Sequence, residues 1–148
     1  MTLFDAFGEG ARRSLFFARW AVSRFGGSEI DEAHLLLGVL QASPESVTRF
    51  TGPTAWTTDR LKRRLHELVP HEPWLPDSTE IPFSDGAKQA IVAAAEHAAL
   101  TQAEVVPAHI VWALLQVPST PAAQLLTEAG VTQQAIESSF GAPPDQAI

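Results

Sequence analysis

The sequence predicts an all-α fold in which two pseudo-symmetric four-helix repeats pack as one domain. Two apolar runs, residues 33–40 and 108–115, each begin with an Ala-His pair, and the second lies 75 residues after the first. A segment that is apolar all round is typical of a buried helix. The segments on either side of the runs also recur in the same order, which indicates a duplicated unit. No segment has the alternating pattern of a strand.

The first helix is predicted from Gly8 to Phe25, where apolar residues recur at helical spacing and the pair Gly26-Gly27 follows. The second should begin near Asp31, a good N-cap, and carry the first apolar run to about Ala42.

A third, short helix is expected with Ser43 as N-cap and Pro44 in its first turn, closed by Gly52. Thr58 should open a fourth helix through Leu61, Leu65 and Leu68. The basic run 60–64 within it is interpreted as a solvated face.

The segment 70–82 contains four prolines, at 70, 73, 76 and 82, and is predicted to be a linker. We therefore divide the single domain, residues 1–148, into repeat 1 (4–69), this linker, repeat 2 (83–140) and a frayed tail (141–148).

Repeat 2 restarts the pattern, because Phe83–Lys88 corresponds to Phe7–Arg12 at an offset of 76. Its expected N-caps and helix starts are Ser84, Val106-Pro107, Thr120-Pro121 and Thr132. Gly130 should close the third helix of this repeat, and the fourth should run to Phe140.

Composition limits the classes of protein. A chain of 148 residues with 45% hydrophobic residues can bury a core without staples, and it has no Cys for disulfides or zinc-thiolate sites. It has neither a secretory signal nor the ~18 consecutive apolar residues of a membrane span. We expect a soluble cytoplasmic monomer that does not bind membranes.

The net charge of −7 is divided unevenly, with +2 in residues 1–64 and −9 in residues 65–148. This acidity argues against nucleic acid and favours basic or apolar partners. Alternatively, it serves only solubility.

Two motifs occur once in each repeat: Phe-x-x-x-Ala-[Arg/Lys], and an Ala-His pair followed by an apolar run. In this order and duplication, they resemble the Clp N-terminal domain of Clp chaperone-unfoldases. Residues 81–88 are similar to the family's start of the second repeat, and the resemblance covers about residues 4–140. It implies a double four-helix repeat that receives substrates and adaptors.

The resemblance also implies a surface that binds peptides, including macrocyclic peptides, and partners among Clp unfoldase or protease components. The matching positions are Phe4, Leu15, Phe16, Pro82, Phe83, Lys88, Ile91 and Val92. In the competing interpretation, Phe83 and Ile91 belong to the core and Lys88 is a solvated charge. Phe16 is bulkier than the aliphatic residue usual in the family, so it would either border the groove or fill it.

Some family members recognise phosphoarginine through a Glu before each motif His. Here Ala33 and Ala108 occupy those positions, so we predict that this activity is absent. Glu32 is one residue away and should leave the helix on another face.

No Gly-x-x-x-x-Gly-Lys-[Ser/Thr] motif and no catalytic constellation occurs, so we predict neither a nucleotide cofactor nor an enzyme. The first hypothesis is a free-standing binding module, either an adaptor or a decoy that sequesters macrocyclic peptides. The alternative is a structural interaction domain that uses its acidic face and has no peptide groove.

His34 and His109 are expected to serve their helix entrances rather than a metal. His66 and His71 have the wrong spacing for a zinc motif, so no metal site is predicted. Trp112 is assigned to the core, whereas Trp74 is either a partner anchor or a packing residue.

Overall fold

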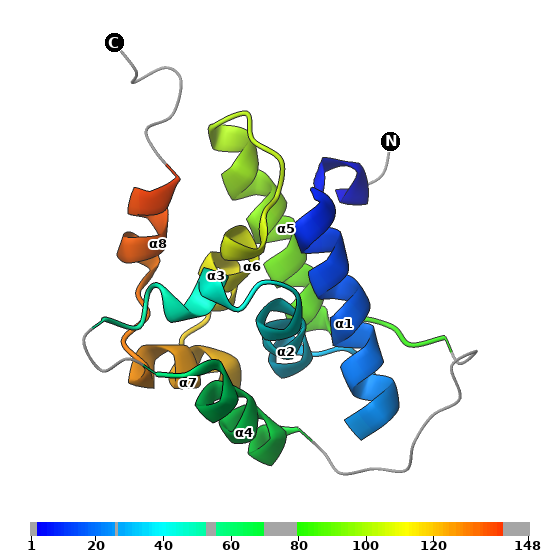
Figure 1. The fold of residues 1–148 in the computed structure, drawn as a ribbon. Coiled ribbons are helices and arrows are strands. Elements are labelled where there is room, and N and C mark those ends of the chain that lie inside the picture. The colour runs from blue at the N-terminus through cyan, green and yellow to red at the C-terminus, as the bar shows by residue number, and fades with distance from the viewer. Residues whose placement is uncertain (1–2, 26, 53–55, 70–79, 141–148) are drawn as a thin grey trace.

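The computed structural model describes residues 3–25, 27–52, 56–69 and 80–140. These residues form a short 3-10 helix, η1 (Leu3–Ala6), and eight α-helices (Figure 1). The helices of repeat 1 are α1 (Glu9–Phe25), α2 (Glu32–Ala42), α3 (Glu45–Thr48) and α4 (Thr58–Leu68). Those of repeat 2 are α5 (Asp85–Leu100), α6 (Pro107–Leu114), α7 (Pro121–Glu128) and α8 (Gln133–Ser139). The all-α prediction is confirmed, and the described residues contain no strand.

Most helix starts follow the predicted caps. The side chains of Asp31, Ser84, Thr120 and Thr132 each accept a hydrogen bond from a backbone N–H in the first turn of the helix that follows. Such a bond satisfies one of the N–H groups that the helix itself leaves unpaired. Gly130 has a φ of +90°, which suits a glycine just after a helix.

The prediction for the third helix was wrong at its cap. Ser43 ends α2, and its hydroxyl bonds to the side chains of Glu45 and Ser46 instead of capping α3. Pro44, already helical, precedes the first residue of α3. The fourth helix begins at Thr58 as predicted, and the side chain of Thr57 accepts the N–H of Arg60.

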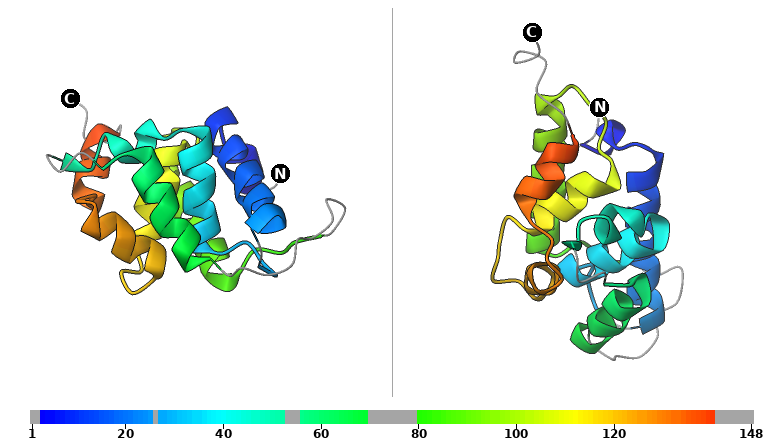
Figure 2. Two further views of the ribbon diagram at one scale, coloured as in Figure 1. Left: turned by 60° about the horizontal axis from the view of Figure 1, so that its bottom comes forward. Right: turned by 60° about the vertical axis from the view of Figure 1, so that its left-hand side comes forward.

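The two predicted apolar runs lie at the centre of the molecule. α2 packs against α1 and α6, α6 packs against α5 and α8, and Figure 2 shows both central helices surrounded by the others. The buried residues of both repeats join in one hydrophobic cluster. Two equivalent contacts, α2 with α7 and α6 with α3, follow the pseudo-symmetry.

Each repeat is also tied to the other by a short parallel bridge. Phe7 pairs with Val105, and Ile30 pairs with Phe83. By the repeat offset, Phe7 corresponds to Phe83 and Ile30 corresponds to Val105. In both bridges, therefore, the residues just before the first helix of one repeat pair with the residues just before the second helix of the other repeat. Four hydrogen bonds of 2.8–2.9 Å close the two bridges.

Among the described helices, none is both long and apolar enough to cross a bilayer. The predicted linker is described only at residues 80–82, where it is not helical. Residues 70–79, with His71 and Trp74, and the predicted tail 141–148 lie outside the described residues.

Candidate functional site

The η1 lead brings Phe4 against the start of repeat 2. The ring centroids of Phe4 and Phe83 are 6.3 Å apart, and Phe7 lies 5.5 Å from Phe4 in an edge-on arrangement. Phe7 is buried, Phe83 is half-buried and Phe4 is 38% exposed. Two predicted site residues that are 79 positions apart in the sequence therefore lie side by side, and part of their aromatic surface is open to solvent.

Arg12 fixes the lead in place. Its Nε donates to the carbonyl of Phe7 at 2.8 Å, and its Nη2 donates to the carbonyl of Phe4 at 3.0 Å. A cation one turn into α1 thus binds main-chain carbonyls of the lead that precedes this helix. The helix dipole makes a cation unfavourable in the first turns of a helix, and these two hydrogen bonds offset that unfavourable interaction.

Lys88 is the counterpart of Arg12 in repeat 2. Its side chain is exposed and, among the described residues, has no hydrogen bond or ion pair. Val92 lies one turn further along α5 and is 40% exposed. Together with Gln89, Ala93 and Glu96, the two residues line a shallow depression on the outer face of α5.

The other predicted site residues are less accessible or more distant. Ile91 is only 2% exposed and belongs to the core, as the competing interpretation held, and Leu15 packs partly against the core. Pro82 is exposed, and its carbonyl accepts the N–H of Ile30. Phe16 is 64% exposed, and its ring contacts Phe17 rather than Phe4 or Phe83. The ring of Phe16 therefore does not fill the surface at Phe83.

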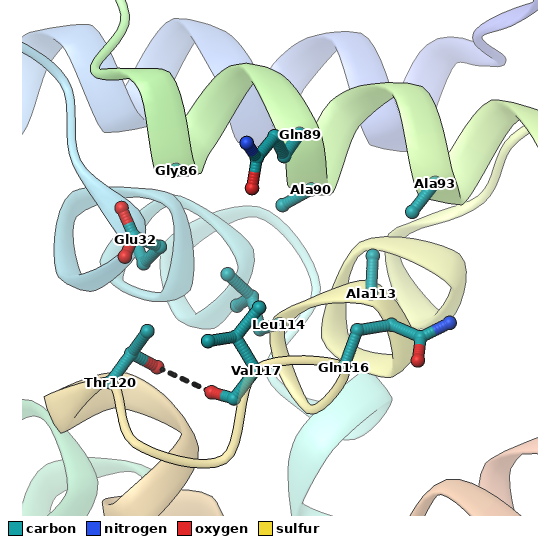
Figure 3. A pocket seen from close by; sticks show the side chains of 10 residues that line it. All are labelled: Glu32, Gly86, Gln89, Ala90, Ala93, Ala113, Leu114, Gln116, Val117 and Thr120. Atoms are coloured by element: carbon teal, nitrogen blue, oxygen red, sulfur yellow. Dashed lines mark hydrogen bonds between the residues drawn. The ribbon is translucent and has the colours of Figure 1, made fainter.

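A deeper pocket, not foreseen from the sequence, adjoins the depression. It has a volume of about 250 Å³ and lies where α5, α6 and the N-terminal ends of α2 and α7 meet (Figure 3). Gln89 and Ala93 line both hollows. The pocket is lined by Glu32, Gly86, Gln89, Ala90, Ala93, Ala113, Leu114, Gln116, Val117 and Thr120.

Polar groups stand at the ends of this pocket and apolar groups form its floor. Figure 3 shows the carboxylate of Glu32 at one end, the amide of Gln116 at the other, and Leu114 and Val117 between them. The hydroxyl of Ser84 donates to Glu32 at 3.2 Å. A Cβ at Gly86 would lie 2.6 Å from that carboxylate, so a larger residue there would displace the Glu32 side chain. A pocket of this composition suits one side chain or another small ligand.

The two motif histidines serve their helix entrances, as predicted. Nδ1 of His34 accepts the N–H of Asp31, and Nδ1 of His109 accepts the N–H of Val106. Burial would raise the pKa of Asp31, but the hydrogen bonds and charge of His34 hold it below its ordinary value. Burial and the neighbouring His97 lower the pKa of His109 to about 4.

An aromatic stack lies beside His109 and is structural. The His97 ring stacks on Trp112 at 4.0 Å, and the His109 ring stacks on Phe140 at 4.1 Å. Trp112 is 8% exposed, which confirms its assignment to the core, and its indole N–H donates to Glu137. Among the described residues, no three His, Asp or Glu side chains are grouped to hold a metal ion.

The comparisons with known proteins agree with this fold. Residues 82–145 match the model of the family described as the Clp repeat (R) N-terminal domain. None of the curated protein sequences compared with the chain matches it significantly.

Solved structures resemble nearly the whole chain. The N-terminal domain of the caseinolytic protease associated chaperone ClpD from Arabidopsis thaliana is 22% identical, with a TM-score of 0.69 over 93% of this chain and 94% of its own. The Hsp104 N-terminal domain from Candida albicans is 20% identical, with the same TM-score over 89% of this chain and 87% of its own.

A third structure comes from work on the coevolution of the ATPase ClpV, the TssB-TssC sheath and the accessory HsiE protein in type VI secretion. It is 19% identical, with a TM-score of 0.69 over 97% of this chain and 94% of its own. At these identities the likeness establishes the fold. The chain has the Clp N-terminal domain fold along nearly its whole length, and residues 82–145 match the family's Clp repeat model.

Proposed function

We propose that this protein is a non-enzymatic module that binds extended segments of other proteins across α5. The proposed groove comprises the aromatic surface of Phe4 and Phe83, the depression at Lys88 and Val92, and the adjoining pocket. Clp N-terminal domains receive substrates and adaptors in Clp unfoldases, so the fold favours this class of function. Unfolded substrates, adaptor segments and macrocyclic peptides share the required chemistry, which is main-chain carbonyls flanked by apolar side chains.

The observation that carries the proposal is the contrast between Arg12 and Lys88. Arg12 holds the chain's own lead by two carbonyl oxygens. Lys88, at the equivalent position, has no such partner among the described residues. An ammonium that shares a depression with the exposed side chain of Val92 is therefore available to the carbonyl oxygens of a bound segment. Charge-assisted bonds of this kind are among the stronger ones.

Fluorescence anisotropy with fluorescein-labelled β-casein, a disordered protein, tests the proposal. The expected result is saturable binding that weakens about tenfold in the double variant Phe4→Ala/Lys88→Ala. Arg63→Ala removes an exposed cation on α4, and Leu100→Ala removes an exposed apolar side chain at the far end of α5. Both control variants should bind like the parent protein. An equal loss of affinity for β-casein in the control variants and in the double variant would contradict the proposed groove.

The acidic surface of residues 65–148 supports a second candidate, an interaction domain for a basic partner. In that case a basic probe such as cytochrome c would bind, added salt would abolish its binding, and Phe4→Ala/Lys88→Ala would strengthen rather than weaken it. The response of this variant to the two probes separates the candidates.

A further inference from the structure

A second surface lies on α1, away from the proposed groove. Arg13, Phe16, Phe17, Trp20 and Arg24 follow one another at spacings of one, three or four residues, which places them on one face of the helix. Phe16 is 64% exposed and Trp20 is 39% exposed. We call Phe16, Phe17 and Trp20 the aromatic stripe. The core does not require these rings on the outer side of a helix.

The rings of the stripe are arranged before any partner binds. Phe16 and Phe17 meet edge-on with centroids 5.3 Å apart, and Phe17 meets Trp20 edge-on at 6.5 Å. The guanidinium of Arg24 lies 5.6 Å from the Trp20 ring. Aromatic rings and Arg held in this way lose little entropy on binding and are typical of interface hot spots.

A pocket of about 210 Å³ adjoins the stripe. Phe17 and Trp20 form its wall on α1, Leu37 and Gln41 contribute from α2, and Lys62 with His66 closes the side on α4. The Lys62 ammonium donates to the Gln41 side chain at 2.9 Å. The pocket has room for one Leu, Met or Phe side chain, and a cation stands at its rim.

The charges around this surface are mainly positive. Arg13 and Arg24 border the stripe at its two ends, and α1 has one acidic residue, Glu9, in its first turn. On α4, Arg64 is paired with Glu128 and Arg60 lies over Trp56, so these two cations serve internal contacts on another face. Lys62 remains at the pocket. A partner that complements the surface must be acidic.

We propose that the aromatic stripe and its pocket form a docking surface for an acidic amphipathic helix of another protein. The apolar face of such a helix covers Phe16 and Trp20 and inserts one side chain into the pocket, while its carboxylates pair with Arg13, Arg24 and Lys62. This is the helix-in-groove mode of recognition. It is independent of the proposed groove, since the two surfaces share no residue.

Two model helices test the proposal. The acidic peptide acetyl-SPEELLAEFLEELAE and its basic counterpart acetyl-SPKKLLAKFLKKLAK are titrated into the ¹⁵N-labelled protein, with the Trp20 indole resonance as the reporter. The acidic peptide should shift this resonance and bind more tightly than the basic one. Trp20→Ala should weaken binding at least about tenfold. The charge reversal Arg13→Glu/Arg24→Glu should also weaken it about tenfold and favour the basic peptide instead.

Lys88→Glu is the matched control, because it alters the proposed groove and should leave affinity for the acidic helix within about twofold. The proposal is wrong if both peptides bind alike, if the shifts fall on α5, or if the charge reversal has no effect. Sedimentation of the free protein tests whether it forms a dimer through the aromatic stripe. A dimer that is lost in Trp20→Ala would show that a second copy of the chain covers the stripe, and it would overturn the proposal of an acidic helix.

Discussion

Gly38 lies where α1 and α2 approach each other closely. A Cβ there would lie 2.1 Å from the carbonyl oxygen of Ser14 and 2.8 Å from the backbone nitrogen of Ala18. Repeat 2 has Ala113 at the equivalent position, so α5 and α6 need no such approach. The pseudo-symmetry therefore holds for the helices but not for their spacing.

Gly38→Ala should destabilise the protein by roughly 1–3 kcal/mol, because the added methyl group forces the two helices apart. In an exposed helix the same change would stabilise by up to about 1 kcal/mol. Urea unfolding measures the difference. The reverse change in repeat 2, Ala113→Gly, should cost about 1 kcal/mol through helix propensity alone. A Gly38→Ala variant more stable than the parent would refute the close approach.

His109 makes stability depend on pH. Its pKa falls from 6.5 to about 4 on folding, so the unfolded chain binds more protons between these values. The stability that neutral His109 contributes is fully present above about pH 6.5 and is lost as the pH falls towards 4. The loss from His109 between pH 7 and pH 4.5 should be roughly 2–3 kcal/mol. Asp31, whose pKa is lowered, loses its contribution only at more acidic pH.

His109→Gln isolates this effect. Gln at the same position can still accept the N–H of Val106, as in a capping box, but does not titrate. Urea unfolding at the two pH values should show the fall in stability reduced by most of that amount. If the variant and the parent lose the same stability, the burial of a neutral His109 is not the cause.

Single residues account for what the sequence could predict about helix boundaries. Asp31, Ser84 and Thr132 are short polar side chains just before an apolar pattern, and capping is a local interaction. Ser43 has the same chemistry but is shared between the end of α2 and the start of α3. Local chemistry alone could not decide between those two roles.

At the scale of elements, the two cross-repeat bridges are the least local feature of the fold. They join leads that are far apart in sequence, through the amides of Gly8, Ile30, Ser84 and Val105. Their pairing was not predicted, because a single bridge leaves no alternating pattern. The pocket below α5 was missed for a related reason, since its walls come from α2, α5, α6 and the start of α7.

The bridges lead to a prediction for hydrogen exchange. Both bridges break when the repeats separate, so the amides of Gly8, Ile30, Ser84 and Val105 should exchange with similar free energies, close to that of global unfolding. The amide of Gln134, near the start of the last helix, should exchange faster. Native-state exchange followed by NMR provides the comparison. Independent, low-energy opening of one bridge would show that the repeats are not held together there.

At the scale of the whole molecule, duplication has produced two similar frames with different surfaces. Repeat 1 uses its Arg12 to fix the lead and presents an aromatic stripe with cationic ends. Repeat 2 leaves Lys88 exposed at the shallow depression and has a net charge of −4, with five acids and one Lys, against +1 for repeat 1. The sequence could predict the frame from its periodicity and the resemblance, whereas the grouping of surface residues depends on packing between repeats.

The decisive test of whether extended protein segments bind across α5 is to map where a bound segment contacts the protein. Unlabelled β-casein is titrated into the ¹⁵N-labelled protein, and the perturbed amides are assigned. If segments bind across α5, perturbations are expected at Phe4, Phe83, Lys88 and Val92, and at Ala113 in the adjoining pocket. Perturbations confined to acidic positions such as Glu104, Glu128 and Glu137, with none on α5, would contradict binding across α5.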